Sequence, residues 1–393
     1  MKLAYVVPRY GADIHGGAEQ AARQLAERMA TRPGYEVEVL TTTATDMVTW
    51  ADDALSGTTH EAGVTVHRFP VTGGRLSSFD QMSASLLAQP DAATPTSEAR
   101  WIDSQGPVSP DLIEAVAATD ADLVIFYPYL YHPTLVGLPL VRGRGVLHPA
   151  AHEEPPLHLP AVGRLVDAAA GLVFQTDAER HILESAHPRA RLRPQLQLGL
   201  GVEGRTGDRQ AARDGVGPTP FLLCLGRVEP GKGSTALARF MAEYLSRRET
   251  DLQLVFAGPV LEAPPVGPGI RVLGPVDEEV KWGLIREARA LVSPSAMESN
   301  SLVVLEGLLA GRPVVVNARC AATTEHARMS GAGLWFDGYG SFEAIIDRLA
   351  EADAAEALGA GGPAYVNGRY GWPELMDRYA TFLEGLASRL ART

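Results

Sequence analysis

The sequence is poor in cysteine and in long apolar runs, and each shortage excludes a class of protein. Its 393 residues contain two cysteines, Cys224 and Cys320, too few for a disulfide framework or a zinc cluster. No uninterrupted apolar run approaches the roughly 18 residues that a membrane-spanning helix needs. The apolar stretch near the start, Leu3 to Val7, is too short for a signal peptide, so we expect a cytoplasmic location.

Basic charge is also scarce, and almost all of it is arginine. The chain has 35 Lys and Arg against 47 Asp and Glu, a formal net charge of −12. A protein that binds nucleic acid irrespective of sequence needs clustered positive charge, so we expect no nucleic-acid partner. Only three basic residues are lysines, namely Lys2, Lys232 and Lys281. A lysine stands out against this arginine-rich background.

Short apolar, β-branched runs alternate with amphipathic stretches along the chain, a pattern typical of a parallel sheet with helices on both faces. In the first half, strands are predicted over 3–7, 37–42, 64–69, 122–126, 144–148 and 172–175. In the second half, they are predicted over 221–225, 252–257, 271–273, 290–293, 314–316 and 334–336. We therefore predict an α/β fold with two doubly wound, Rossmann-like domains facing a central cleft, where ligands bind at the carboxyl ends of strands.

The composition also predicts the domain boundaries. Residues 198–220 are rich in Gly, Asp, Arg and Pro, which is typical of a linker. We assign 1–200 to an N-terminal domain and 201–372 to a C-terminal domain. Residues 373–393 form a terminal helix that we expect to pack back toward the N-terminal domain. The segment 76–105 lacks periodicity, so we predict an irregular insertion or mobile loop near the site.

Two glycines, Gly16 and Gly17, come directly before the first predicted helix. Glycines allow a ligand to approach the backbone closely, and the helix N-terminus offers free N–H groups to an anion. The spacing is not G-x-G-x-x-G, so the dinucleotide fingerprint is absent. A glycine-rich turn without a ligand is the alternative interpretation.

A second cluster follows the predicted strand 221–225. Arg227 and Lys232 are five residues apart across a glycine-rich turn that opens a helix. A guanidinium fork and a compact ammonium together suit a diphosphate. The turn does not match a P-loop, and two solvated basic residues are the alternative.

The third cluster surrounds a helix predicted from Ser301 to Ala310, with Leu302, Leu305 and Leu309 as its apolar stripe. Its N-terminus again suits a phosphate. Glu306 lies off the stripe, about 9 Å along the helix axis. That separation fits the ribose attached to a bound phosphate, and a carboxylate can accept from both ribose hydroxyls. An incidental solvated glutamate is the alternative.

Taken together, these segments resemble the retaining GT-B glycosyltransferases of family 4. The resemblance is carried by Gly16-Gly17-Ala18-Glu19, by Gly226-Arg227…Lys232-Gly233, and by Glu298 and Glu306 at a Glu-x7-Glu spacing followed by Leu-Ala-Gly-x-Pro-Val-Val. Residues 146–156 also resemble the central histidine segment of that family. The matches run in the correct order over nearly the whole chain.

The resemblance implies a role for each matching residue. Arg227 and Lys232 would hold the donor diphosphate and stabilise the leaving group, and Glu306 would bind the ribose. Glu298 would contact the transferred sugar, with His152 beside it; His148 is the rival for that histidine. The turn at Asn300, Ser301 and Leu302 would bind phosphate through its backbone, and Gly16 and Gly17 would belong to the loop that closes on the phosphate.

The sequence departs from the family pattern at three places, of which Tyr35, in place of a usual His, is peripheral. After the first acid the family usually has Glu-Ser/Gly-Phe-Gly, whereas here Asn300 and Ser301 follow Glu298-Ser299. The usual Gly-Gly after the Pro-Val-Val strand is replaced by Arg319-Cys320-Ala321. That second loop normally lies near the donor sugar, so the choice of sugar stays open.

The activity implied by the resemblance is transfer of a sugar from a nucleoside diphosphate sugar, with UDP as our choice, without a metal or any further cofactor. Residues 1–200 hold 15 basic and 23 acidic side chains and no polybasic helix. We therefore expect a small soluble acceptor, such as a sugar, cyclitol or natural-product intermediate, and no strong membrane association. The sequence does not indicate an oligomeric state. A GT-B sugar-nucleotide epimerase or hydrolase and a non-catalytic nucleotide- or sugar-binding protein remain alternatives.

Overall fold

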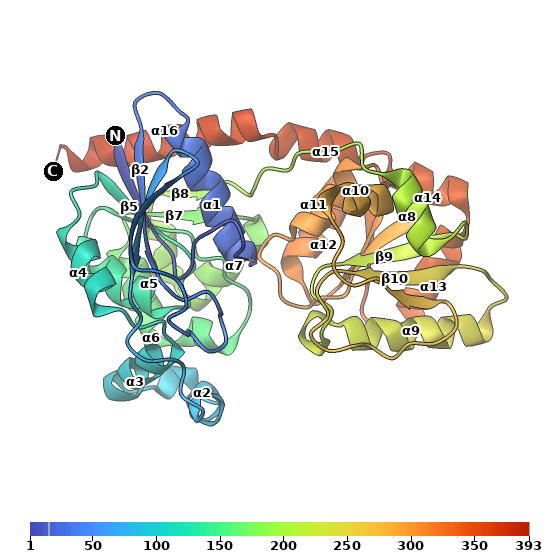
Figure 1. Cartoon of the computed structure of the whole chain (residues 1–393), viewed down its shortest axis with the longest axis horizontal. Helices are drawn as coiled ribbons and strands as arrows, with labels where there is room; N and C mark the ends of the chain where they lie inside the picture. Colours follow the sequence, from blue (N-terminus) through green and yellow to red (C-terminus); the bar gives the residue numbers. More distant parts are fainter. Residues whose placement is uncertain (15, 393) are drawn as a thin grey trace. The chain divides into compact units, whose positions relative to one another are not determined.

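A computed structural model describes residues 1–14 and 16–392 of the chain. It divides into two compact units, which are described separately below. Unit 1 comprises Met1–Leu198 and Met376–Thr393, and unit 2 comprises Gly199–Leu375. Both units are α/β, and each is built around one sheet (Figure 1).

Unit 1 contains an eight-stranded sheet in the order β3-β4-β2-β1-β5-β6-β7-β8. Its strands are β1 Lys2–Val6, β2 Glu36–Thr42, β3 Gly57–Glu61, β4 Val64–Phe69, β5 Leu123–Phe126, β6 Gly145–Leu147, β7 Gly171–Phe174 and β8 Gln195–Gln197. All neighbours are parallel except the β3–β4 hairpin. The strand order reverses at β1, so the topological switch point, where ligands bind in such sheets, lies between β1 and β5.

Helices cover both faces of this sheet. They are α1 Gly17–Ala30, α2 Phe79–Leu87, α3 Pro95–Gln105, α4 Pro110–Ala118, α5 His132–Gly137, α6 Pro160–Ala168 and α7 Asp177–Ala186, with short 3₁₀ turns η1 Pro90–Ala92, η2 Leu138–Val141, η3 Pro155–His158 and η4 Pro188–Leu192. Alternate residues of β1 point to the two faces of the sheet. Ala4 and Val6 join the core under α4 and α6, whereas the Tyr5 hydroxyl contacts the hydroxyl of Tyr379.

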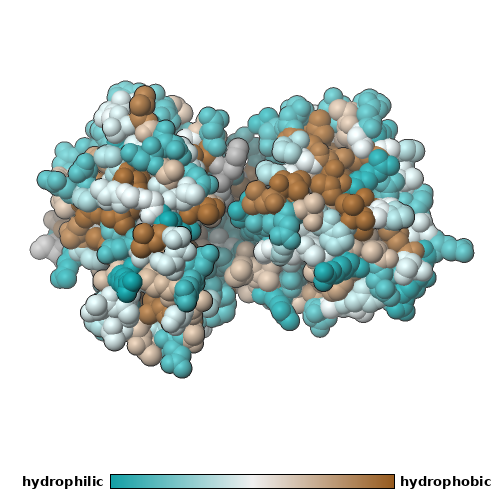
Figure 2. Space-filling model, turned by 60° about the horizontal axis from the view of Figure 1, so that its bottom comes forward, coloured by the Kyte–Doolittle hydropathy of each residue, from teal (hydrophilic) through white to brown (hydrophobic). Residues whose placement is uncertain are grey.

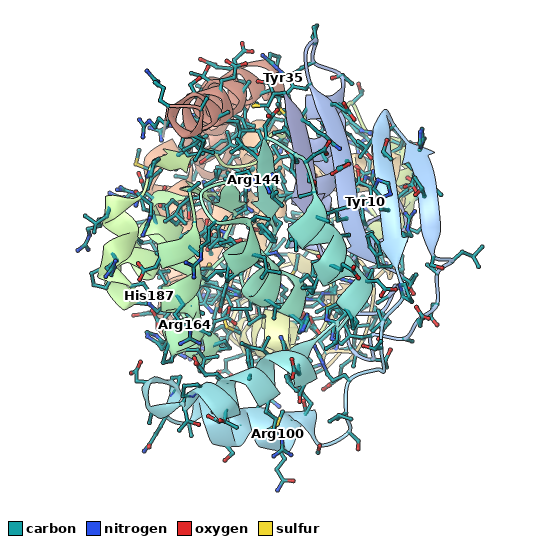
Figure 3. The ribbon with its side chains drawn as sticks, turned by 90° about the vertical axis from the view of Figure 1, so that its left-hand side faces the viewer. Tyr10, Tyr35, Arg100, Arg144, Arg164 and His187 are labelled. Carbon is teal, nitrogen blue, oxygen red and sulfur yellow. The ribbon has the colours of Figure 1, made fainter. Side chains whose placement is uncertain are left out.

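The prediction that residues 76–105 are irregular is wrong, because α2, η1 and α3 fill this segment. Thr94 caps α3 in a capping box with Ser97, and Pro95 occupies the first turn. Trp101 is buried in the unit 1 core, and Glu98 accepts hydrogen bonds from the Ala161 amide and from Arg164 on α6, the latter at 2.7 Å. Figure 3 labels Arg100 on α3 and Arg164 on α6. Helical packing of this segment therefore depends on contacts that are distant in sequence.

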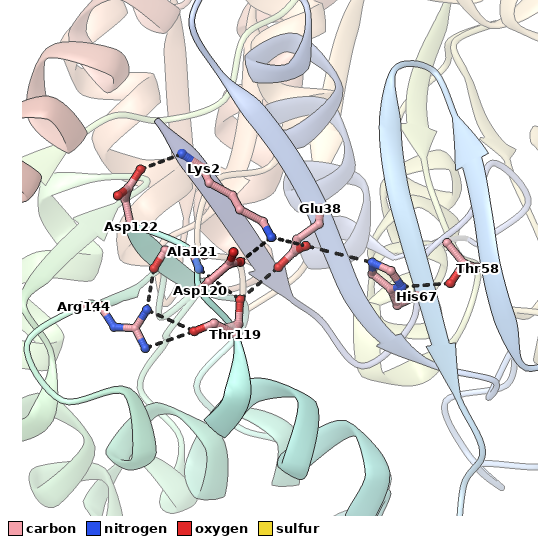
Figure 4. A network of polar contacts seen from close by, with 9 residues as sticks. All are labelled: Lys2, Glu38, Thr58, His67, Thr119, Asp120, Ala121, Asp122 and Arg144. Carbon is pink, nitrogen blue, oxygen red and sulfur yellow. Dashed lines mark hydrogen bonds and ion pairs between the residues drawn. The ribbon is translucent and has the colours of Figure 1, made fainter.

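Lys2, the first of the three lysines, belongs to a polar network at the amino end of the unit 1 strands (Figure 4). Its Nζ lies 3.2 Å from Glu38 on β2 and also contacts Asp120. Its backbone N–H donates to Asp122 at 2.7 Å, and Arg144 donates to the carbonyl of Thr119. This network ties β1 and β2 to the segment that leads into β5, at the end of the sheet opposite to the carboxyl ends of its strands.

Unit 2 contains a six-stranded, fully parallel sheet in the order β11-β10-β9-β12-β13-β14. Its strands are β9 Phe221–Leu225, β10 Gln253–Ala257, β11 Ile270–Val272, β12 Ala290–Ser293, β13 Val314–Asn317 and β14 Gly333–Phe336. These agree with the predicted strands to within one or two residues. The order reverses at β9, so the switch point of this unit lies between β9 and β12.

Two apolar cores lie on opposite faces of the unit 2 sheet. The helices are α8 Arg209–Val216, α9 Ser234–Arg247, α10 Glu278–Glu287, α11 Leu302–Leu309, α12 Ala321–Ser330, α13 Tyr339–Ala350, α14 Ala352–Gly359 and α15 Gly362–Arg369, with η5 Pro230–Lys232 before α9. Leu223 of β9 packs in the core with α10 and α11, and its neighbour Leu222 packs in the other core with α9 and α13. Figure 1 shows these helix pairs on opposite sides of the sheet.

The segment between the two sheets is only partly a linker. Residues 199–208 carry no helix or strand, but α8 follows, with Asp208 as its N-cap. The last helix, α16 Trp372–Leu390, begins in unit 2 and continues in unit 1 from Met376 onward. Within unit 1, Tyr379 of α16 contacts Nε2 of His148 at 3.0 Å. Figure 2 shows apolar residues interspersed with polar ones on the displayed face of each unit.

Candidate nucleotide-sugar site

The predicted donor-binding residues of unit 2 follow β9 and β12, the two strands at the switch point. Arg227 and Lys232 lie in the turn after β9, and Glu298 lies in the loop after β12. Parallel strands present their carboxyl ends at one edge of the sheet, so these two segments, far apart in sequence, meet there. This edge is where an open α/β sheet binds ligands.

Lys232 and Glu298 form an ion pair across the switch point. Lys232 Nζ donates to Glu298 Oε1 at 2.7 Å, and the two side chains are 31% and 23% exposed. Gly233 adopts φ +81° directly after Lys232, and a Cβ there would lie 2.7 Å from the carbonyl oxygen of Pro294. Glycine at 233 therefore allows the turn after β9 to approach the loop after β12, which brings the pair together.

Arg227 lies on the same turn but has a different partner. Its Nη2 is 3.3 Å from Glu229 Oε1, and its side chain is 43% exposed. Arg227 is therefore solvent-accessible on the same turn as Lys232, and its guanidinium pairs with a carboxylate of that turn.

Asn300, Ser301 and Leu302 form the predicted phosphate-binding turn. The helix that follows begins at Leu302, one residue later than predicted, and its N-cap Ser301 has φ +72° and makes no side-chain capping bond. The first N–H groups of α11 thus have no partner from a capping side chain, and they carry the positive end of the helix dipole. This arrangement suits a phosphate oxygen.

The predicted apolar stripe of α11 is partly wrong. The buried side chains are those of Val304, Leu305 and Leu308, whereas Leu302 and Leu309 are only partly buried. The sheet under the helix decides which stripe is buried, because α11 is apolar on nearly every side. Glu306 lies beside the buried face, and its side chain is 14% exposed.

Lys281 of α10 holds the Glu306 carboxylate, a contact that the sequence analysis missed. Its Nζ lies 2.8 Å from Glu306 Oε1 and 2.9 Å from Glu278 Oε1. Burial raises the pKa of Glu306 above its usual value, and the positive charge of Lys281 opposes that rise. The rarity of lysine was the available signal, because the two glutamates of the Glu-x7-Glu motif each pair with one of the three lysines.

In unit 1, Gly16 is the N-cap of α1. The two glycines predicted to bind a ligand, Gly16 and Gly17, differ in the space around them. A Cβ on Gly16 would lie 2.1 Å from Glu19 Oε2, whereas a Cβ on Gly17 would meet nothing within 4 Å. Glu19 is buried and accepts from Nε of the buried Arg9 at 3.0 Å. Gly16 therefore makes room for an internal ion pair, while Gly17 has open space. His15, which precedes them, lies outside the described residues.

The two candidate histidines of unit 1 differ sharply in environment. His148 is buried, stacks on Tyr127 with ring centroids 4.9 Å apart, and has a pKa lowered to about 3 by burial. The His152 side chain is 29% exposed, and its Nδ1 lies 3.4 Å from Glu154, which accepts a hydrogen bond from Tyr129. His148 therefore has the environment of a core residue, whereas His152 is accessible to a ligand.

Metal-ligand clusters and membrane-spanning helices are both absent from the part of the chain that the structure describes. No group of three or more His, Cys, Asp or Glu side chains there is arranged to hold a metal ion. No helix there is both long enough and apolar enough to span a membrane. Both cysteines are free and buried.

The fold and this site define a doubly wound α/β protein with charged side chains at the switch point of unit 2, and comparisons with known proteins identify its class. Residues 219–352 match the family "Glycosyl transferases group 1". The chain is 30% identical over 287 residues to D-inositol 3-phosphate glycosyltransferase 1 of Catenulispora acidiphila, covering 63% of this chain and 68% of that one. It is 32% identical over 233 residues to D-inositol 3-phosphate glycosyltransferase of Kribbella flavida, a match that spans 53% of each chain.

Solved structures agree in fold over nearly the full length. Sucrose-phosphate synthase from Thermosynechococcus elongatus is similar with a TM-score of 0.69 and 16% identity, covering 99% of both chains. Anabaena HepE, solved in complex with UDP, is similar with a TM-score of 0.66 and 15% identity, covering 98% of this chain and all of that one. The chain belongs to the group 1 glycosyltransferases, the GT-B proteins of family 4, as the sequence motifs indicated.

Proposed function

We propose that this protein transfers a sugar from a nucleoside diphosphate sugar to a hydroxyl of a small sugar or cyclitol acceptor. We propose UDP as the nucleoside diphosphate. The observation that carries this proposal is the Lys232–Glu298 pair at the β9–β12 switch point. Unit 2 also contains Arg227, the start of α11 without a side-chain cap, and the Lys281–Glu306 pair. Every one of these groups suits one part of a nucleotide sugar.

The diphosphate is assigned to Arg227, Lys232 and the N-terminus of α11. Departure of the nucleoside diphosphate develops negative charge on its terminal phosphate, and fixed positive groups aimed at that charge lower the barrier. Lys232 has three N–H donors, so it can keep Glu298 and still donate to phosphate. We propose that these groups suffice without a metal ion.

Glu306 is assigned to the ribose. A carboxylate accepts from two adjacent hydroxyls, which favours ribonucleotide donors over deoxyribose ones. Lys281 supports this role because its charge opposes the burial-driven rise in the pKa of Glu306. HepE was solved in complex with UDP, which supports uracil as the base of the donor.

Glu298 and His152 are assigned to the transferred sugar. Lys232 holds Glu298 in place, and we assign Glu298 to orienting the sugar rather than to attacking it. We propose transfer with retention at the anomeric carbon by attack on the same face that the diphosphate leaves. In that step, the acceptor oxygen bonds to the anomeric carbon as the bond to the phosphate oxygen breaks, and the leaving phosphate takes the acceptor proton.

The acceptor is assigned to unit 1, where Gly16, Gly17 and His152 lie. The relatives from Catenulispora and Kribbella carry the name inositol 3-phosphate glycosyltransferase, which supports a cyclitol or sugar acceptor. An excess of acidic residues over residues 1–200 supports a small acceptor over an anionic membrane.

The test measures nucleoside diphosphate release by the purified chain from UDP-, ADP- and GDP-sugars, with and without inositols, inositol phosphates and simple sugars. Release that requires an acceptor, and continues in EDTA, supports the proposal, and NMR of the product checks retention. Release without any acceptor indicates a hydrolase or epimerase instead. Tight nucleotide binding with no release under any condition indicates a binding protein. Sedimentation with anionic liposomes at physiological salt would contradict the small acceptor.

A further inference from the structure

Ser301, at the start of α11, has an unusual backbone conformation. Its φ of +72° and ψ of +87° lie in the left-handed region, which favours glycine and is unfavourable for a residue with a Cβ. The Ser301 side chain makes no capping bond, yet its carbonyl accepts the first α11 bond, from the Leu305 amide at 3.3 Å. The surrounding structure must therefore hold this residue in place.

The side chain of the preceding residue, Asn300, is anchored by His326. It is 5% exposed, and its Oδ1 lies 3.1 Å from Nε2 of His326 on α12. The amide Nδ2 is enclosed and has no partner among the described residues. The contact with His326 is thus the side-chain interaction that fixes Asn300, and through it the turn before Ser301.

His326 is itself held by two tyrosines. Its Nδ1 lies 2.9 Å from the hydroxyl of Tyr365, which lies 3.3 Å from the hydroxyl of Tyr370. An amide oxygen only accepts, so we assign the ring proton to Nε2, which leaves Nδ1 to accept from Tyr365. His326 is fully buried, and the Tyr370 ring packs edge-on against it with centroids 5.6 Å apart. The ring can therefore neither rotate freely nor reach water.

We propose that His326 is a positioning residue for the donor site. It holds Asn300, so that Ser301 keeps its left-handed conformation and the first N–H groups of α11 stay aimed at the donor phosphate. Asn300 and His326 thereby stabilise a backbone conformation that a glycine at position 301 would adopt without support. The role in phosphate binding rests on the proposed function, whereas the role in holding the turn does not.

The experiment compares His326→Phe with the double variant His326→Phe/Ser301→Gly. Phenylalanine keeps an aromatic ring but loses the Nε2 proton, so we expect UDP affinity, measured by calorimetry, to fall at least tenfold. Glycine adopts positive φ at little cost, so the double variant should recover to within about threefold of the wild type. The matched control is Val366→Ala, a buried residue on the same helix as Tyr365, which should lower the melting temperature and leave UDP affinity unchanged.

A readout without nucleotide separates the two parts of the argument. Hydrogen exchange of the Leu305 amide should accelerate in His326→Phe and slow again in the double variant, because this amide bonds to Ser301. If affinity and exchange stay at the wild-type level in His326→Phe, or if Ser301→Gly restores neither, the positioning role is wrong. If the wild type binds no nucleotide while exchange behaves as expected, the proposed function is wrong. The role of His326 in holding the turn before α11 is then still supported.

Discussion

Lys281 Nζ lies 2.8 Å from Glu306 Oε1, so the acid assigned to the donor ribose is paired with a lysine from the neighbouring helix, 25 residues earlier. Lys232 holds Glu298 in the same way at 2.7 Å. The two acids of the Glu-x7-Glu motif thus each have their own cation. The pairing orients both carboxylates within unit 2, and the charge of Lys281 opposes the burial-driven rise in the pKa of Glu306.

Replacing Lys281 should change the pH dependence of donor binding. Lys281→Met removes the positive charge that opposes the burial-driven rise in the pKa of Glu306. The Glu306 carboxyl therefore stays protonated to higher pH. We expect KM for the donor to rise severalfold at pH 6, where more of the Glu306 carboxyl is protonated, and to recover as the pH increases. Lys281→Arg, which keeps the charge, is the control. A KM that does not depend on pH in Lys281→Met would contradict the role of this pair.

Replacing Lys232 should abolish most of the activity without unfolding the protein. Lys232→Met removes a positive group assigned to the leaving diphosphate, so we expect kcat/KM to fall by about 10²–10³-fold. The ion pair with Glu298 is partly solvated, so its loss should cost at most about 1 kcal/mol of stability. Arg239→Ala, an exposed cation on the neighbouring helix α9, is the control and should retain wild-type turnover. Wild-type turnover in Lys232→Met would show that Lys232 does not stabilise the leaving diphosphate.

The two glycines before α1 should respond differently to alanine. A Cβ at position 16 overlaps the Glu19 carboxylate and disrupts its pair with Arg9, so Gly16→Ala should lower the free energy of unfolding by roughly 1–3 kcal/mol. Gly17→Ala has open space and should change it by less than about 0.5 kcal/mol. Urea unfolding measures both. A loss of activity in Gly17→Ala at unchanged stability would support a ligand at this turn, and equal stability losses would contradict the steric argument.

Buried His148 should make the protein less stable in acid. Burial lowers its pKa to about 3, whereas an unfolded chain has a histidine pKa near 6.5. Between these values the unfolded state binds the extra proton, so stability is retained above about pH 6.5 and falls as the pH drops toward 3, by up to about 1.4 kcal/mol per pH unit. Urea unfolding between pH 7 and pH 4 measures this slope. His148→Phe should reduce it, and an unchanged slope would show that His148 does not titrate on unfolding.

The sequence alone determined the class of fold and the position of each motif along the chain. Strands such as 221–225 and 290–293 were predicted at the residues where they occur, because short apolar runs between turn residues report local structure. The glycines and basic residues after β9 and the acids around α11 could be identified for the same reason. Their spacing is local information that a sequence carries directly.

The tertiary structure decided which of these residues contact each other. The pairing of Lys281 with Glu306 depends on how α10 lies beside α11, and the anchoring of Asn300 by His326 depends on α12. Helical packing of residues 95–105 depends on Arg164, more than 60 residues away, which is why their weak periodicity misled the prediction. The tertiary structure likewise decided that His148 is buried and that His152 is partly exposed. Burial and ion pairing arise from contacts between distant segments, and no spacing in the sequence encodes them.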